Sequence, residues 1–65
     1  MFIVNGESIN VNHPVSLAKF LQDNNYNKKR IAVEVNGVIV SRSQYTETYL
    51  KNCDRVEIVS FVGGG

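Results

Sequence analysis

The chain has 65 residues, of which 43% are hydrophobic, and its seven basic and six acidic residues give a formal net charge of +1. A chain of this length forms one small domain, which buries only about 60% of the surface that its unfolded chain exposes. The balanced charge excludes a strong basic field, so neither nucleic acid nor an anionic membrane is expected as a partner.

Two segments have the pattern of a β-hairpin. In FIVNGESINV and IAVEVNGVIV, strand-like residues lie on both sides of an Asn-Gly pair, at Asn5-Gly6 and at Asn36-Gly37. A type I′ turn requires positive φ at both central residues, which asparagine and glycine adopt at low cost. We therefore predict hairpins over residues 2–11 and 31–40.

One helix is predicted between the hairpins. Pro14 marks a boundary, and Ser16 is a suitable N-cap residue. Residues 23–25 are short and polar, and they end the helix because their side chains compete for its backbone groups. The apolar spacing between these limits predicts one buried face, formed by Leu17, Phe20 and Leu21.

Two further segments are predicted to be irregular. The basic residues 28–30 form a solvated loop, because no glycine-rich turn accompanies them. Residues 41–54 have no sustained period and predict a connector with a short helical turn, which ends in a tight turn formed by Asn52 and Asp54. Three of its side chains are expected to close the edge of the core: Tyr45, Tyr49 and Leu50.

The last strand is predicted over residues 55–62. Side chains alternate along a strand, so Val56 and Ile58 share one face, while Val59 and Phe61 lie on the other with the charged Glu57. A single helix covers only one face of the sheet. We therefore expect Val56 and Ile58 to face the helix, and Val59 and Phe61 to lie on the open face.

The first strand shows the same alternation. If Ile3 faces the helix, Phe2 and Val4 lie on the open face beside Val59 and Phe61. An exposed apolar patch usually marks a contact surface. The alternatives are a bulge that turns Phe61 inward, or scattered apolar surface residues without a function.

Residue types that carry catalysis are present only singly. His13 stands alone before Pro14, and the acidic residues are scattered, so no metal site or catalytic pair is predicted. Cys53 has no motif around it, and we interpret it as a half-buried turn residue. A single cysteine suits a reducing compartment. We find no pattern of a secretory signal and no apolar run of about 20 residues that would form a membrane-spanning helix. We therefore predict a cytoplasmic location.

Three glycines, Gly63, Gly64 and Gly65, follow the predicted last strand directly. A phosphate loop is excluded, because it needs backbone N–H groups held by a following helix. Glycines lack a Cβ and adopt any φ/ψ region, so they suit a narrow channel in a partner enzyme. A free carboxyl group on Gly65 is ionised at neutral pH and becomes an acyl donor once joined to a leaving group. The alternative is a frayed terminus or an expression scar.

Three segments carry a family resemblance: VNGE, VNGVIVSRSQY and CDRVEIVSFVGGG. Together they resemble the ThiS family, sulfur carriers of thiamine thiazole biosynthesis, over the whole chain. The resemblance implies an α+β, ubiquitin-like β-grasp fold: a mixed sheet of four to five strands with one helix packed on one face. It implies a single domain over residues 1–62 and a flexible glycine tail over residues 63–65. Many relatives have glycine where this chain has Cys53, so we expect Asn52 to take the positive φ of that turn.

The resemblance also implies a reaction cycle that centres on Gly65. A ThiF-like adenylating enzyme uses ATP to join AMP to the Gly65 carboxylate. Cysteine-derived sulfur then displaces AMP, and a ThiG-like thiazole synthase takes the sulfur from the resulting thiocarboxylate. Gly63 and Gly64 enter the partner's active site. In this fold the first and last strands are parallel neighbours, so the docking patch comprises Phe2, Val4, Val59 and Phe61.

Within this scheme the chain is a protein co-substrate that binds no cofactor itself, and it is not an enzyme. Two alternatives stay open. One is a MoaD-like carrier that delivers sulfur to molybdopterin synthesis. The other is a ubiquitin-like binding module without chemistry at its tail.

Overall fold

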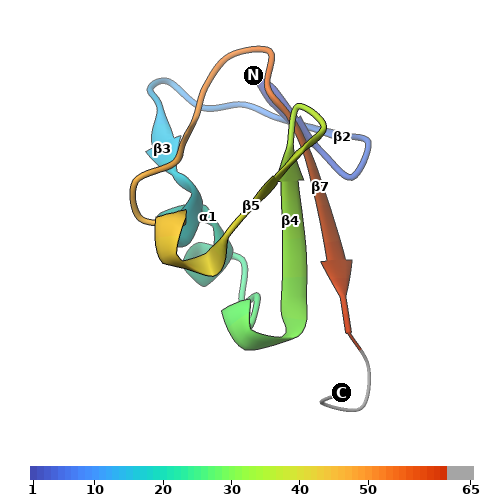
Figure 1. The fold of residues 1–65 in the computed structure, drawn as a ribbon. Coiled ribbons are helices and arrows are strands. Elements are labelled where there is room, and N and C mark those ends of the chain that lie inside the picture. Colours follow the sequence, from blue (N-terminus) through green and yellow to red (C-terminus); the bar gives the residue numbers. More distant parts are fainter. Residues whose placement is uncertain (62–65) are drawn as a thin grey trace.

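A five-stranded mixed sheet forms the centre of the computed structural model, which describes residues 1–61 (Figure 1). Its strand order is β2-β1-β7-β4-β5, and β7 pairs parallel with β1 and antiparallel with β4. The helix α1, Leu17–Asp23, packs on one face. The α+β, β-grasp prediction is thereby confirmed. The strands are β1 Phe2–Val4, β2 Glu7–Ile9, β4 Ile31–Val35, β5 Val38–Val40 and β7 Arg55–Ser60.

Four further elements complete the described chain. The strands β3, Val15–Ser16, and β6, Tyr49–Leu50, form a separate antiparallel pair that the sequence did not predict. Strands of two residues are too short to show a period, which is why the pattern along the chain did not reveal them. The 3₁₀ helices η1, Lys28–Arg30, and η2, Arg42–Gln44, occupy the predicted basic loop and connector.

Both predicted hairpin turns are confirmed. Asn5 and Gly6 have φ of 48° and 84°, and Asn36 and Gly37 have φ of 53° and 83°, as a type I′ turn requires. The second hairpin has the predicted limits, whereas the first is shorter than predicted, because β2 ends at Ile9.

The side-chain amides of both turn asparagines bind the central strand β7. The Ile58 N–H donates to Asn5 Oδ1 at 2.7 Å, and Asn5 Nδ2 donates to the Ile58 carbonyl at 3.1 Å. On the other side of β7, the Arg55 N–H donates to Asn36 Oδ1 at 2.9 Å, and Asn36 Nδ2 donates to Asp54 Oδ1 at 3.0 Å. The turn residues therefore hold β7 from both neighbouring hairpins.

The helix follows its sequence signals. The Ser16 side chain accepts a hydrogen bond from the Lys19 N–H at 3.1 Å, as an N-cap residue does. At the other end, Asn24 Nδ2 donates to the Phe20 carbonyl at 2.8 Å, and Asn25 has a φ of 63°. The predicted apolar face is buried through Leu17, Phe20 and Leu21.

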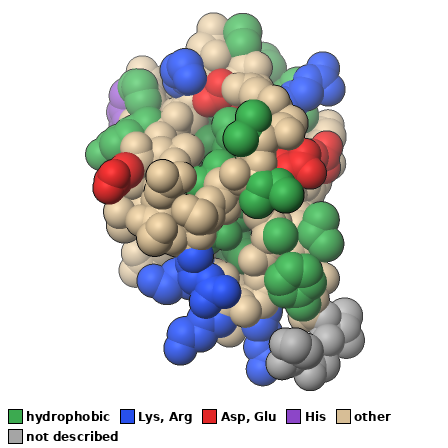
Figure 2. Space-filling view, viewed as in Figure 1, with side chains coloured by type: hydrophobic (Ala, Val, Ile, Leu, Met, Phe, Trp, Pro, Cys, Tyr) green, Lys and Arg blue, Asp and Glu red, His purple; other side chains and the backbone are tan. Residues whose placement is uncertain are grey.

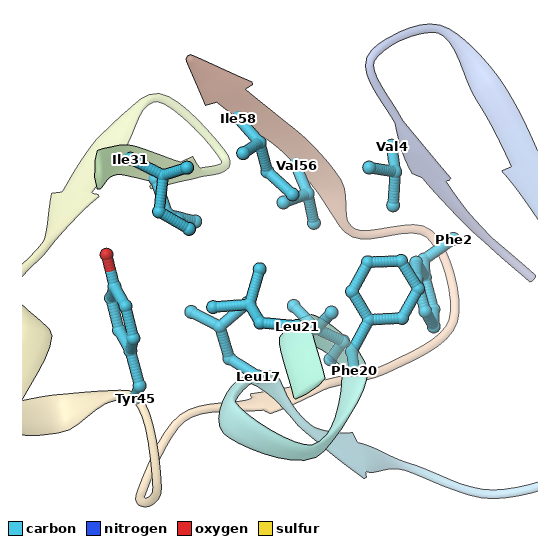
Figure 3. Close-up of a cluster of buried hydrophobic side chains, with 11 residues drawn as sticks. Phe2, Val4, Leu17, Phe20, Leu21, Ile31, Tyr45, Val56 and Ile58 are labelled. Carbon is cyan, nitrogen blue, oxygen red and sulfur yellow. The ribbon is translucent and has the colours of Figure 1, made fainter. Parts of the chain in front are cut away.

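The core lies between this helix and the sheet, and it corrects the prediction for the first strand. Phe2 and Val4 are buried, with 0% and 6% exposure, and Figure 3 shows both directed toward the helix. The Phe2 and Phe20 rings meet edge to face at a centroid distance of 5.6 Å. The predicted orientation was wrong because Val4 pairs with Val56, which faces the helix, so the two side chains share that face.

The connector confirms two of its three predicted core residues. Tyr45 and Leu50 are buried, at 4% and 0% exposure, whereas Tyr49 is 57% exposed. Tyr49 was assigned wrongly because it precedes Leu50 in β6, and neighbouring strand residues point to opposite faces.

The turn before β7 differs from the prediction at Cys53. Cys53 itself has positive φ, at 76°, and it is exposed rather than half-buried. Asn52 has another function, because its Oδ1 accepts a hydrogen bond from the N-terminal ammonium group at 2.7 Å. The Cys53 N–H donates to the Met1 carbonyl at 2.8 Å, so the turn is attached to the beginning of the chain.

The predicted end of the domain at residue 62 and the predicted glycine tail, residues 63–65, lie outside the described residues and stay predictions. Within residues 1–61, α1 is too short to cross a lipid bilayer, and no other helix there is long and apolar enough.

Candidate functional site

The sheet face opposite α1 presents apolar side chains to solvent. Val56 and Ile58 are 1% and 7% exposed and face the helix, as predicted, whereas Val59 and Phe61 are 58% and 52% exposed. The Phe61 N–H donates to the Arg30 carbonyl at 2.6 Å. The backbone hydrogen bonding between β7 and β4 therefore continues one residue beyond both strands, to Phe61 and Arg30. This geometry excludes the predicted alternative in which a bulge turns Phe61 inward.

Cross-strand pairing adds residues to this face that the sequence analysis missed. Val59 lies opposite the half-buried Ala32, and Glu34 lies opposite both Glu57 and the 72% exposed Ile39. Neighbours in adjacent strands share a face, so these side chains form one surface with Val59 and Phe61. We call its apolar members the open-face patch: Ala32, Ile39, Val59 and Phe61.

The predicted docking set is therefore only partly brought together. Val59 and Phe61 share the open face, whereas Phe2 and Val4 lie in the core and take no part in a surface. Ile39 replaces them as an exposed apolar residue. The signal for Ile39 was present in the second hairpin, because the Asn36-Gly37 turn sets Ile39 opposite the charged Glu34.

Charged residues lie on both sides of the open-face patch. Glu34 and Glu57 are exposed and face each other across β4 and β7. The basic residues Lys28, Lys29 and Arg30 are exposed in η1, which directly precedes β4. Figure 2 shows hydrophobic side chains on the right of the molecule with acidic side chains above them, and basic side chains both at the upper right and at the lower end.

Asp54 is the one buried charged residue among those described, and it positions the start of β7. Its Oδ2 accepts the Lys51 N–H at 2.9 Å, and its Oδ1 accepts Asn36 Nδ2 at 3.0 Å and lies 3.6 Å from Lys51 Nζ. Burial works to raise the pKa of Asp54, but these hydrogen bonds and the Lys51 charge outweigh it and lower the pKa below its usual value. Asp54 is thus an ionised structural group.

Other candidate groups are dispersed. The exposed His13 ring has its Nδ1 3.0 Å from the Pro14 carbonyl oxygen, and the exposed Cys53 lies in the turn before β7. Within residues 1–61, no three His, Cys, Asp or Glu side chains gather closely enough to hold a metal ion.

A hollow of about 650 Å³ lies on the helix side, between the end of α1 and η2. Tyr26 and Tyr45 line it together with Lys28 and Arg42, and its lining contains no carboxylate, imidazole or thiol. Burial raises the pKa of Tyr45 although the Arg42 charge acts to lower it, so Tyr45 is a neutral hydroxyl. The open-face patch is therefore the better candidate for a functional surface.

Comparisons with known proteins place this chain in a family. The model of the ThiS family matches residues 2–65. The chain is 39% identical over 62 residues to the uncharacterized protein ycf40 of Porphyra purpurea, covering 95% of this chain and 87% of that protein. It is also 33% identical over 63 residues to a thiazole synthase of Paramagnetospirillum magneticum, covering 97% of this chain but 19% of that protein.

A solved structure agrees with the family match. The crystal structure of the thiamine biosynthesis protein ThiS from Geobacter metallireducens has a TM-score of 0.81 and 28% sequence identity, and the match covers 98% of this chain and 97% of that one. The chain therefore belongs to the ThiS family, the ubiquitin-like sulfur carriers of thiamine biosynthesis.

Proposed function

We propose that this chain carries sulfur as a thiocarboxylate on Gly65 and donates it for thiazole formation. The observation that carries the proposal is the extent of the family match, which runs through residue 65 and so includes all three glycines, Gly63 to Gly65. The chain acts as a co-substrate, and the catalytic groups and the ATP site belong to its partners.

The chemistry takes place at the Gly65 carboxylate. One carboxylate oxygen attacks the α-phosphorus of ATP on a ThiF-like enzyme, and pyrophosphate leaves. The acyl carbon of the resulting adenylate is then attacked by cysteine-derived sulfur at the oxidation level of sulfide, and AMP leaves with the transferred oxygen. The product has one carboxylate oxygen replaced by sulfur, and a ThiG-like thiazole synthase accepts that sulfur.

The described domain supports this chemistry by supplying a binding surface. Ordering a glycine costs roughly 1–2 kcal/mol of backbone entropy, so a partner that threads Gly63 and Gly64 into a channel must bind the domain elsewhere. The open-face patch fits this requirement, because Val59 and Phe61 are exposed at the end of β7 that leads toward the glycines. We assign docking of the adenylating enzyme to this patch.

The thiazole synthase relative supports the choice of sulfur acceptor. A segment similar to 97% of this chain occupies 19% of that protein, so a ThiS-like sequence and a protein named thiazole synthase occur in one polypeptide. This observation favours thiazole formation over the MoaD-like alternative, in which the acceptor is the large subunit of a molybdopterin synthase.

Intact mass spectrometry tests the proposal. The chain is incubated with ATP, a ThiF-like enzyme and a sulfur donor, and we expect a mass increase equal to the exchange of one oxygen for sulfur, mapped to Gly65. A matched chain with one alanine added after Gly65 is expected to stay unmodified, because its carboxylate is no longer on Gly65. An unchanged Gly65 with an enzyme proven active on another ThiS protein would refute the proposal.

A further inference from the structure

The open-face patch lies between groups of opposite charge, and this arrangement has a direction. On the open face, the exposed basic Arg55 begins β7 and is followed by the acidic Glu57 and by Val59, and Phe61 comes directly after the strand. Glu34 lies beside Glu57, Ala32 lies beside Val59, and the Arg30 carbonyl binds the Phe61 N–H. From Glu57 onward, the face therefore changes from acidic through apolar to basic toward the C-terminal end of β7, with Arg55 before Glu57.

The acidic end is unfavourable in the free domain. Glu34 and Glu57 lie directly opposite each other on neighbouring strands, and like charges in this position are destabilising. Neither carboxylate is within 4.0 Å of a cationic nitrogen of the described residues, whose ion pairs are Lys19–Asp23 and Lys51–Asp54. A cation supplied from outside the domain would remove this repulsion.

The basic end is held in place next to the patch. Arg30 is fixed by the 2.6 Å hydrogen bond between its carbonyl and the Phe61 N–H, and the Asn27 side chain caps η1 by accepting the Lys29 N–H at 2.9 Å. The side chains of Lys28, Lys29 and Arg30 are exposed, and none forms an ion pair with a described residue. They present positive charge beside Phe61 from a defined backbone.

We propose that these two charged ends fix the direction in which the adenylating enzyme docks. The complementary surface of that enzyme is apolar at its centre, places an arginine or lysine against Glu34 and Glu57, and places carboxylates against residues 28–30. A flat apolar patch alone permits rotated complexes, whereas opposite charges at its two ends make the rotated arrangement repulsive. Only the matched direction brings the Phe61 end to the active site. This inference rests on the proposed function.

Charge-neutral variants test the inference. We compare the double variant Glu34→Gln/Glu57→Gln with the control Glu47→Gln, which changes an exposed acid in the turn between η2 and β6, outside the five-stranded sheet. Association with the ThiF-like enzyme is followed by stopped-flow kinetics. We expect the double variant to associate about tenfold more slowly at about 0.1 M salt, with a much smaller difference at about 1 M, where charges are screened within about 3 Å. The control should remain within about twofold of the wild type.

The same variants separate docking from stability. Because the glutamate pair is repulsive in the free domain, the double variant should unfold at the same or a higher temperature than the wild type, although it binds more weakly.

At the basic end, the double variant Lys28→Gln/Arg30→Gln should also slow association with the enzyme. Its control is Arg42→Gln, which changes an exposed basic residue in η2.

Two results distinguish this inference from the proposed function. If both double variants associate at the wild-type rate while Val59→Asp prevents binding, the patch docks the enzyme without using its charges, and the inference is wrong. If the wild-type chain binds the enzyme with the expected charge dependence but Gly65 is never converted to a thiocarboxylate, the proposed function is wrong, whereas the docking direction is supported.

Discussion

The hydrogen bonds from Asn5 to β7 provide a quantitative test of how the central strand is held. Replacing Asn5 with glycine keeps a residue that tolerates the φ of 48° but removes both side-chain bonds to the Ile58 backbone, at 2.7 and 3.1 Å. Leaving a buried polar group unpaired costs about 1–3 kcal/mol. Asn5 is exposed and water reaches this site, so we use the lower end for each bond and expect a loss of about 2 kcal/mol.

This loss is large for a domain of 65 residues. Domains have about 0.05–0.15 kcal/mol of stability per residue, which corresponds to about 3–10 kcal/mol here. In a domain of this size, a change of 1 kcal/mol shifts the unfolding midpoint by about 4–8 °C. Thermal unfolding followed by circular dichroism should therefore show a midpoint about 8–16 °C lower for Asn5→Gly.

Asn25→Gly is the matched control. Asn25 also has positive φ, at 63°, and its exposed side chain makes no hydrogen bond with the described residues. The same substitution there should change the free energy of unfolding by less than about 0.5 kcal/mol. Equal losses in the two variants would show that glycine entropy, and not the bonds to Ile58, causes the effect, and the reasoning about β7 would be wrong.

Three other predictions concern the core, the buried acid and the turn before β7. Phe2→Ala should lower the free energy of unfolding by about 3–5 kcal/mol in urea denaturation. Val59→Asp should leave the free energy of unfolding within about 0.5 kcal/mol of the wild type and reduce partner binding measured by calorimetry. Similar losses of unfolding free energy in the two variants would place Val59 in the core. Because the folded-state pKa of Asp54 lies below the ordinary value of 3.8, its contribution to stability is present above pH 3.8 and is lost as the pH falls through the folded pKa. Unfolding free energies measured across this acidic range should fall less steeply for Asp54→Asn than for the wild type, and parallel curves would contradict the assignment. Cys53→Gly should raise the unfolding midpoint slightly, because glycine adopts a φ of 76° without the cost of about 1 kcal/mol that a Cβ imposes; a lower midpoint would show that Cys53 is not strained.

The hairpins and the helix could be predicted because their determinants are close together in the chain. An Asn-Gly pair requires only two residues to form a type I′ turn, and Ser16 caps a helix whose apolar positions follow within a few residues. The alternation in β7 was also predicted correctly from local residues. The charged Glu57 shows which of the two alternating sets of side chains faces solvent. These features depend on local chemistry alone.

The orientation of β1 could not be obtained in this way. The run of Phe2, Ile3 and Val4 is apolar throughout, so alternation permits two phases with no charged residue to choose between them. Pairing of Val4 with Val56 selects the phase, and it places Phe2 against Phe20 in the core. A small domain needs this aromatic burial, and the patch is consequently smaller on the β1 side than expected.

The sequence by itself determined the fold class and the family, and it indicated the three glycines as the candidate site of chemistry. The residues that carry each of these signals are contiguous in the chain. Only the tertiary structure decided which residues share the open face. Ile39, Glu34 and Glu57 come from three strands. The hairpin turn sets Ile39 opposite Glu34, whereas Glu57 and Val59 join these residues only through the register of β7 on β4. That register is set by hydrogen bonds and core packing between segments far apart in the chain, which no local pattern encodes.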